Sequence, residues 1–179
     1  MSQSTAIFAG GCFWCTEAVF QQLDGVKSVV SGYTGGSEAT ANYEAVCMGN
    51  TGHAEAIEVG FDPEKISYET LLQVFLLAAH DPTQLNRQGA DQGTQYRSAI
   101  FYLDEEQKQA ALTAIRRIDQ QGVYPDSIVT EVTPLTQFYP AEVNHQNFCN
   151  RNPNYPYVMF AAMPKVEKVK KQFTELLKK

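Results

Sequence analysis

Apolar residues along the chain occur in two alternating patterns, short continuous runs and helical spacing. Runs that are followed by turn residues predict strands at 6–9, 26–31, 54–61, 96–103 and 128–135. Apolar positions three and four residues apart predict helices from about 12 to 23, over 68–80, after Asp104, over 141–151 and over 164–179. We therefore expect an α+β fold, an α/β sandwich whose mixed sheet has a ferredoxin-like core and is flanked by helices.

Glycine, proline and polar residues interrupt these elements. Gly10-Gly11 predicts a tight turn before the first helix, and the glycines of 32–36 predict a turn that opens a polar loop to about Asn42. Residues 81–95 predict a long surface loop, and two prolines predict extended chain over 152–157. The C-terminal segment before the last amphipathic helix is thus expected to be irregular.

Composition and charge narrow the class of protein. The chain has 179 residues, 44% of them hydrophobic, which suits one domain over 1–179. Its net charge of −6, without a block of like charges outside the last helix, argues against nucleic acid or an anionic membrane as partner. The N-terminus lacks a basic segment, and no apolar stretch reaches the roughly 20 residues that cross a bilayer. We expect a cytoplasmic monomer.

Residues 11–15, Gly-Cys-Phe-Trp-Cys, bring two of the four cysteines and the only tryptophan into one turn of chain. The elements on either side place Cys12 at a strand-to-helix junction. Unpaired N–H groups and the dipole at a helix start favour the thiolate, which is the nucleophilic form of cysteine. Cys12 is therefore the candidate nucleophile.

Other interpretations of the same cysteines are inert core thiols and a thiol-disulfide oxidoreductase. Four cysteines are too few for a disulfide scaffold. A zinc site needs four ligands in paired spacing, and Cys12 and Cys15 offer one pair, so we expect no metal.

Four further motifs follow the cysteines. They are Gly-Tyr-Thr-Gly-Gly at 32–36, Thr-Gly-His-Ala-Glu at 51–55, Gly-Thr-Gln-Tyr-Arg-Ser at 93–98, and Ala-Glu at 141–142 followed by His-Gln at 145–146. With these five motifs in order, the chain resembles the A-type peptide methionine sulfoxide reductases over about residues 6–157. The resemblance implies reduction of the S epimer of methionine sulfoxide, free or in oxidised proteins, without a cofactor. Thioredoxin or dithiothreitol would be the external reductant.

The resemblance also implies roles for the residues that match the family motifs. Cys12 would attack the sulfoxide sulfur, while Phe13 and Trp14 would wall the pocket for the substrate's terminal methyl group. Glu55 would protonate the departing oxygen, for which its carboxyl must be desolvated enough to keep a proton near neutral pH. Glu58 fits a solvent-facing strand carboxylate better.

Five other matched residues would surround this centre. The hydroxyls of Tyr43 and Tyr96 would hydrogen-bond the oxygen and stabilise its developing charge. Asp91 would lie at the rim of the site, near the substrate backbone. Glu142 and His145 would either border the substrate cleft or hold the C-terminal segment in place.

The catalytic cycle needs a second thiol, which turns the sulfenic acid on Cys12 into a disulfide that thioredoxin reduces. Many relatives use cysteines in a glycine-rich C-terminal tail, which is absent here, and have glycine where this chain has Cys15. Cys15 is the first choice for this resolving thiol, since it lies three residues from Cys12. Cys149 is the alternative, and in a relay of two disulfides it could also receive the oxidation after Cys15. Cys47 matches a family cysteine that is regarded as a bystander near the core. A methionine-binding or redox-sensing module without turnover is a further competing function.

Overall fold

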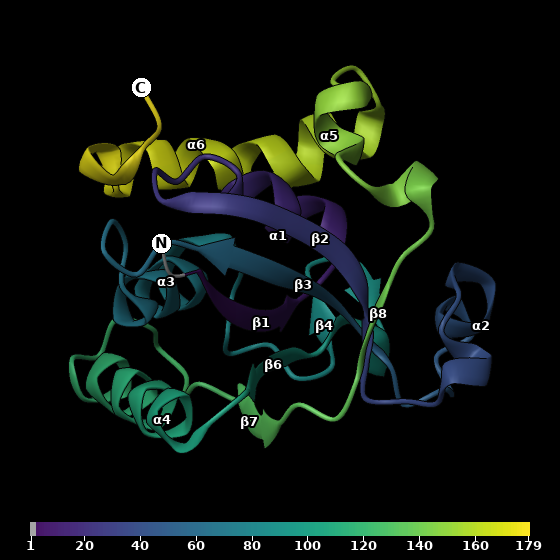
Figure 1. Cartoon of the computed structure of the whole chain (residues 1–179), viewed down its shortest axis with the longest axis horizontal. Helices are drawn as coiled ribbons and strands as arrows, with labels where there is room; N and C mark the ends of the chain where they lie inside the picture. Colours follow the sequence, from purple (N-terminus) through teal and green to yellow (C-terminus); the bar gives the residue numbers. More distant parts are fainter. Residues whose placement is uncertain (1–2) are drawn as a thin grey trace.

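A computed structural model describes residues 3–179, which form one six-stranded sheet, a small hairpin and helices (Figure 1). The large sheet has the strand order β7-β6-β1-β3-β2-β8. Its strands are β1 (Ser4–Gly10), β2 (Val26–Thr34), β3 (Ala54–Phe61), β6 (Ser98–Tyr102), β7 (Glu131–Pro134) and β8 (Phe138–Pro140). β6 and β7 are parallel and the other neighbouring pairs are antiparallel, which confirms the predicted mixed sheet.

The helices pack mainly against one face of this sheet, with α1 and α6 in contact there (Figure 1). They are α1 (Phe13–Phe20), α2 (Tyr43–Cys47), α3 (Tyr68–Val74), α4 (Glu105–Gln120), α5 (Phe148–Arg151) and α6 (Met163–Gln172). The main core lies on this face, where the ring of Phe8 on β1 is 4.8 Å from that of Phe75 and 5.5 Å from that of Phe20. Alternate residues of β1, Ile7 and Ala9, face a smaller apolar cluster on the opposite side. None of the helices within residues 3–179 is long and apolar enough to span a membrane.

Local sequence signals explain where several elements begin. The Asp104 carboxylate accepts a hydrogen bond from the Gln107 backbone N–H (2.8 Å), and the Gln107 side chain accepts one from the Leu103 N–H (3.0 Å). This reciprocal capping begins α4 where the sequence predicts it. The predicted helix over 68–80 is also present, although its last turns are a π-helical segment, Phe75–Ala79, and His80 is extended.

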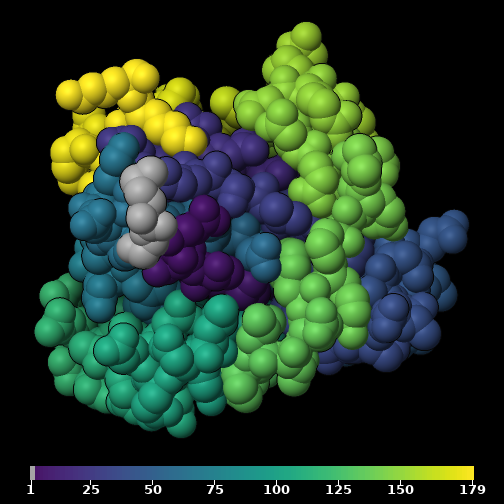
Figure 2. Space-filling view, in the orientation of Figure 1, coloured from purple at the N-terminus to yellow at the C-terminus, as the bar shows by residue number. Residues whose placement is uncertain are grey.

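The glycine-rich motif at 32–36 contains the end of a strand and not only the predicted turn. Gly32 to Thr34 continue β2 and pair with both β3 and β8, so the turn begins at Gly35, whose φ is +108°. The polar loop predicted after it contains α2, which begins at Asn42 because the Asn42 side chain accepts a hydrogen bond from the Ala45 N–H (2.9 Å). This segment projects from one edge of the molecule (Figure 2).

Gly32 is required because neighbouring atoms occupy the space where a side chain would lie. A Cβ there would be 2.4 Å from the Phe138 ring and 2.5 Å from the Tyr139 carbonyl oxygen. We expect Gly32→Ala to lower the free energy of unfolding by about 1–3 kcal/mol, measured by urea denaturation. Ser31→Ala is the control: it removes a buried hydroxyl without a hydrogen-bond partner among the described residues and should not destabilise the protein. Equal stability of the two variants would contradict the packing argument.

The predictions for the C-terminal third need correction. The helix predicted over 141–151 is reduced to a 3₁₀ turn, Val143–His145, and α5. The extended chain predicted over 152–157 is a turn that leads into a π-helical segment, Val158–Ala162, continuous with α6. Pro164 therefore lies inside a helical run and does not begin it. Proline has no N–H to donate to the preceding turn, and the turns directly before it are the wider π turns. The last helix ends at Gln172, followed by a 3₁₀ turn, and not at residue 179.

Element bounds differ elsewhere by a few residues. Tyr96 belongs to a 3₁₀ turn, Thr94–Tyr96, before β6, and β7 is shorter than the predicted strand over 128–135. The predicted loop over 81–95 contains a short hairpin, β4 (Arg87–Gln88) and β5 (Asp91–Gln92). These segments bring residues from distant parts of the sequence to the end of β1 where α1 begins.

Candidate active site

A cavity of about 210 Å³ opens at the junction between β1 and α1. Its lining comes from α1 and its N-cap, α2, β3, the 81–96 region and the segment before α6: Cys12, Trp14, Tyr43, Glu55, Asp91, Tyr96, Tyr155 and Tyr157. Six of these eight residues are predicted site residues. The sequence does not indicate Tyr155 and Tyr157, because their segment is predicted to be extended and no pattern in it points to a cavity.

Cys12 is the N-cap residue of α1, and its side chain is 9% exposed. Gly11 makes the preceding turn with φ +89°, where a Cβ would be 2.6 Å from the Gln88 side chain. Burial raises the pKa of the Cys12 thiol well above its ordinary value, and a hydrogen bond with Cys15 and the charge of Glu55 act in the same direction. The Trp14 backbone N–H in the first turn of the helix lowers this pKa, as expected of a helix start, but desolvation outweighs it and the net shift is upward.

Cys15 and Cys149 lie next to the nucleophile. The Cys15 thiol is fully buried, and its hydrogen bond with Cys12 lowers its pKa to about 7. The Cys149 thiol donates to the Trp14 carbonyl oxygen (3.3 Å). Cys47, in contrast, is exposed at the end of α2, so the expectation that it lies near the core is wrong.

Glu55 on β3 is 1% exposed and faces the start of α1. Its Oε1 accepts a hydrogen bond from the backbone N–H of Phe13 (3.1 Å). Burial raises the Glu55 pKa to about 8, and the negative charge of Asp91 contributes. The carboxyl therefore holds a proton at neutral pH, as a general acid must. Glu58 on the same strand is only half-buried, which confirms the expectation that Glu55 is the buried one of the two.

Trp14 forms one wall of the cavity and is fixed by two neighbours from the C-terminal third. Its ring stacks on Phe148 with centroids 3.8 Å apart and an interplanar angle of 4°. Its Nε1–H donates to Nδ1 of His145 (3.2 Å), and the His145 ring lies 4.3 Å from that of Tyr43. Burial lowers the His145 pKa, which keeps the ring neutral and able to accept.

Phe13 and Glu142 lie behind the cavity and do not line it. The Phe13 ring is fully buried, 5.6 Å from the rings of both Tyr33 and His145. Glu142 accepts hydrogen bonds from the Tyr33 hydroxyl (2.8 Å) and the Tyr43 backbone N–H (2.9 Å). Of the two alternatives for Glu142 and His145, the geometry supports holding the chain in place: both residues position Trp14 or Tyr43.

The tyrosine hydroxyls supply polar hydrogens around the cavity. Burial raises the pKa values of Tyr43 and Tyr96, so both hydroxyls stay protonated and can donate. The Tyr157 hydroxyl donates to Asp91 (2.5 Å) and accepts from the Cys15 thiol at 3.8 Å. Asp91 is thereby attached to the cavity wall, beside the nucleophile.

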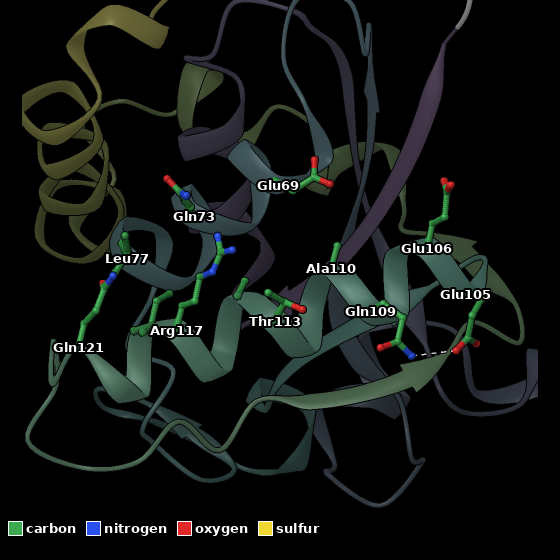
Figure 3. Close-up of a pocket in the computed structure, with 12 residues that line it drawn as sticks. Glu69, Gln73, Leu77, Glu105, Glu106, Gln109, Ala110, Thr113, Arg117 and Gln121 are labelled. Carbon is green, nitrogen blue, oxygen red and sulfur yellow. Dashed lines mark hydrogen bonds between the residues drawn. The ribbon is translucent and has the colours of Figure 1, made fainter.

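A larger groove, of about 820 Å³, lies elsewhere, between α3 and α4 (Figure 3). Side chains from both helices line it, among them Glu69, Gln73, Gln109 and Arg117. No cysteine, histidine or tyrosine is among its lining residues, so it lacks the thiol and phenol groups that line the Cys12 cavity. Within residues 3–179, no three His, Cys, Asp or Glu side chains are grouped so that they could hold a metal ion.

Comparison with known proteins gives concordant results. The sequence model of the family described as "Peptide methionine sulfoxide reductase" matches residues 4–177. The peptide methionine sulfoxide reductase MsrA of Nautilia profundicola is 56% identical over 163 residues, which cover 91% of this chain and 92% of that protein.

Solved structures agree. Mxr1 from Saccharomyces cerevisiae in its reduced form matches with a TM-score of 0.82 and 31% identity, over 91% of this chain and 90% of that one. The structure of Mxr1 in complex with Trx2 matches with a TM-score of 0.57 and 21% identity, over 82% of this chain and 84% of that one. The chain therefore belongs to the peptide methionine sulfoxide reductases of the MsrA type, enzymes that reduce methionine sulfoxide.

Proposed function

We propose that this enzyme reduces the S epimer of methionine sulfoxide, free and in proteins, by means of Cys12 and Glu55, and so repairs oxidised proteins. The assignment of these catalytic roles to Cys12 and Glu55 rests on one observation. A small cavity places a buried thiol and a carboxyl that is protonated at neutral pH beside two hydroxyl donors. A thiol-disulfide oxidoreductase does not need such a proton donor, nor does a module that only binds methionine.

In the first step the Cys12 sulfur, as thiolate, attacks the sulfoxide sulfur, and Glu55 gives its proton to the sulfoxide oxygen. This attack forms an S–S bond between Cys12 and the substrate. The oxygen then passes to the Cys12 sulfur while its bond to the methionine sulfur and the S–S bond both break, so methionine leaves and Cys12 becomes a sulfenic acid. Tyr43 and Tyr96 donate hydrogen bonds to the oxygen while its charge develops. Trp14 gives the substrate methyl group an apolar wall, and Asp91 meets the substrate backbone at the rim.

In the second step a thiol attacks the Cys12 sulfenic acid, an S–S bond forms and water leaves. Cys15 is suited to this step because its thiol already hydrogen-bonds that of Cys12 and has a pKa of about 7, so much of it is thiolate at neutral pH. A dithiol reductant then returns both cysteines to thiols with two electrons and two protons. Thioredoxin is the proposed reductant, in keeping with the complex of yeast Mxr1 with Trx2.

We expect a Cys12–Cys15 disulfide when the enzyme reacts with methionine sulfoxide in the absence of reductant, mapped by mass spectrometry. In Cys15→Ser, sulfenic acid should accumulate at Cys12 and be trapped by dimedone, because the neighbouring thiol is missing. Cys149→Ser is the matched control and should still form the bridge. A Cys12–Cys149 bridge in the wild-type enzyme would instead make Cys149 the resolving thiol.

The experiment that tests the function is turnover of the separated sulfoxide epimers, free and in a peptide, with dithiothreitol as reductant. The S form should be consumed with equal amounts of methionine and oxidised dithiothreitol, and the R form should persist. Consumption of the R form would refute the stereochemical assignment. Thiol oxidation without loss of sulfoxide would favour a thiol-disulfide oxidoreductase.

We also infer that the chain acts as one domain with a ferredoxin-like core. The four central strands support this, because they have the order β6-β1-β3-β2 with all neighbours antiparallel, and α1 and α3 precede β2 and β6. That arrangement is expected of a split βαβ fold. The family match over residues 4–177 is consistent with a single unit.

A further inference from the structure

A second groove, of about 600 Å³, adjoins the active-site cavity. It lies between the β4–β5 hairpin, the end of the α3 helical run and the chain around the start of α6. Asp91 and Tyr157 line both spaces, and their hydrogen bond forms part of the boundary between them. The groove is therefore continuous with the site where the sulfoxide would react.

One wall of this groove carries an unusual side chain. Phe160 is 79% exposed, although Val158 and Ala162 in the same π-helical segment are fully buried. Ala161 and Pro164, from the same stretch of chain as Phe160, add apolar surface, and so does Ala90 on the hairpin. Asp81, Lys165 and Lys168 also line the groove, so its surface is mixed and the apolar part is centred on Phe160. An exposed aromatic residue at the edge of an active site indicates a binding surface.

The sizes of the two spaces suggest what occupies each. The active-site cavity, at about 210 Å³, is smaller than the roughly 300–1,000 Å³ of pockets that enclose whole ligands. It accommodates one side chain, so the residues before and after a sulfoxide in a peptide must lie outside it. The adjoining groove, at about 600 Å³, has room for such a neighbour.

Resting on the proposed function, we infer that this groove, with Phe160 as its main contact, binds an apolar side chain that flanks methionine sulfoxide in a protein substrate. The site would give the enzyme a preference among peptide sequences. Free methionine sulfoxide has no flanking residue and would not use the groove. The enzyme's two substrate types therefore provide an internal control.

The test compares free methionine S-sulfoxide with two pentapeptides, one with leucine and one with serine on both sides of the sulfoxide, all with dithiothreitol. The wild-type enzyme should have about tenfold higher kcat/KM for the leucine peptide, as expected of one side chain in an apolar pocket. Phe160→Ala should remove that preference, and Ala90→Trp, which fills the groove from its exposed rim, should lower the rate with both peptides. Neither variant should change the rate with free sulfoxide, and Leu103→Ala, at an exposed apolar residue outside the groove, should change none of the rates.

Several outcomes would overturn this inference. One is equal kcat/KM for the two peptides in the wild-type enzyme. Another is an equal loss with free and peptide substrates in the variants, which would mean that the groove supports the reaction site and not flanking residues. An effect seen only when thioredoxin replaces dithiothreitol would make the groove a docking surface for the reductant. Absence of turnover with all three substrates in the wild type would instead refute the proposed function itself.

Discussion

Replacing Cys12 by serine is expected to abolish sulfoxide reduction, with a loss of about 10⁴-fold or more. The cavity contains no other thiol that could take over, because Cys15 does not line it and Cys149 donates to the Trp14 carbonyl. A serine hydroxyl is a far weaker nucleophile than a cysteine thiolate. Rates with dithiothreitol as reductant, and methionine released in a single turnover without reductant, both measure the effect.

The exposed thiol of Cys47 provides a matched control. Cys47→Ser makes the same exchange of sulfur for oxygen and should release one equivalent of methionine per enzyme, as the wild type does. Cys12→Ser should release none and should unfold at a similar urea concentration, since the exchange changes little volume. Measurable turnover by Cys12→Ser would show that another group attacks the sulfoxide.

Glu55→Gln should slow the chemical step by about 10²–10⁴-fold, the usual contribution of a general acid. Glutamine keeps the shape of the side chain and can still accept the Phe13 N–H hydrogen bond, but it cannot give a proton to the oxygen. Single-turnover rates measured near neutral pH test this. Glu58→Gln, on the same strand and half-buried, is the control and should behave like the wild type. A loss of less than tenfold in Glu55→Gln would exclude the proposed role.

The pH dependence separates this role from a structural one. The attack needs the Cys12 thiolate, and the pKa of that thiol lies well above its ordinary value, so rates should rise with pH. The wild-type rate should level off above pH 8, where Glu55 loses its proton. Glu55→Gln has no carboxyl to titrate, so its rate should keep rising and the two rates should approach each other at high pH. The pH dependence of stability should also differ between the wild type and Glu55→Gln. In the wild type the buried Glu55 carboxyl keeps a proton that the unfolded chain loses near pH 4.5, so the free energy of unfolding falls between about pH 4.5 and 8. In the variant this decrease should be reduced.

The fold could be predicted where local signals and burial agree. The apolar runs of β1 and β3 and the cap at Asp104 are local features, and the structure has these elements at the expected places. The end of β2 could not be predicted, because Gly32 to Thr34 extend the strand by pairing with β3 and with β8, and β8 is more than a hundred residues away. The π-helical run before α6 likewise depends on packing that outweighs the local effect of Pro164.

The functional site, like the fold, could be predicted only in part from the sequence. Motifs and family resemblance indicated Cys12, Glu55 and Trp14, but not the protonation state of the thiol, which depends on how deeply the finished fold buries it. Tyr157 was missed because its partner, Asp91, is 66 residues away in the sequence. Phe13 was expected at the cavity surface and instead packs behind it, since the first turn of α1 faces Trp14 outward and Phe13 into the core.

The hydrogen bond from the Phe13 N–H to Glu55 is made by the peptide unit directly after Cys12. The spacing of acid and nucleophile is consequently a property of the main chain, and every amino acid except proline supplies the same donor at position 13. Substitutions of the Phe13 side chain could therefore change the packing behind the cavity and still keep the hydrogen bond that holds Glu55 next to Cys12.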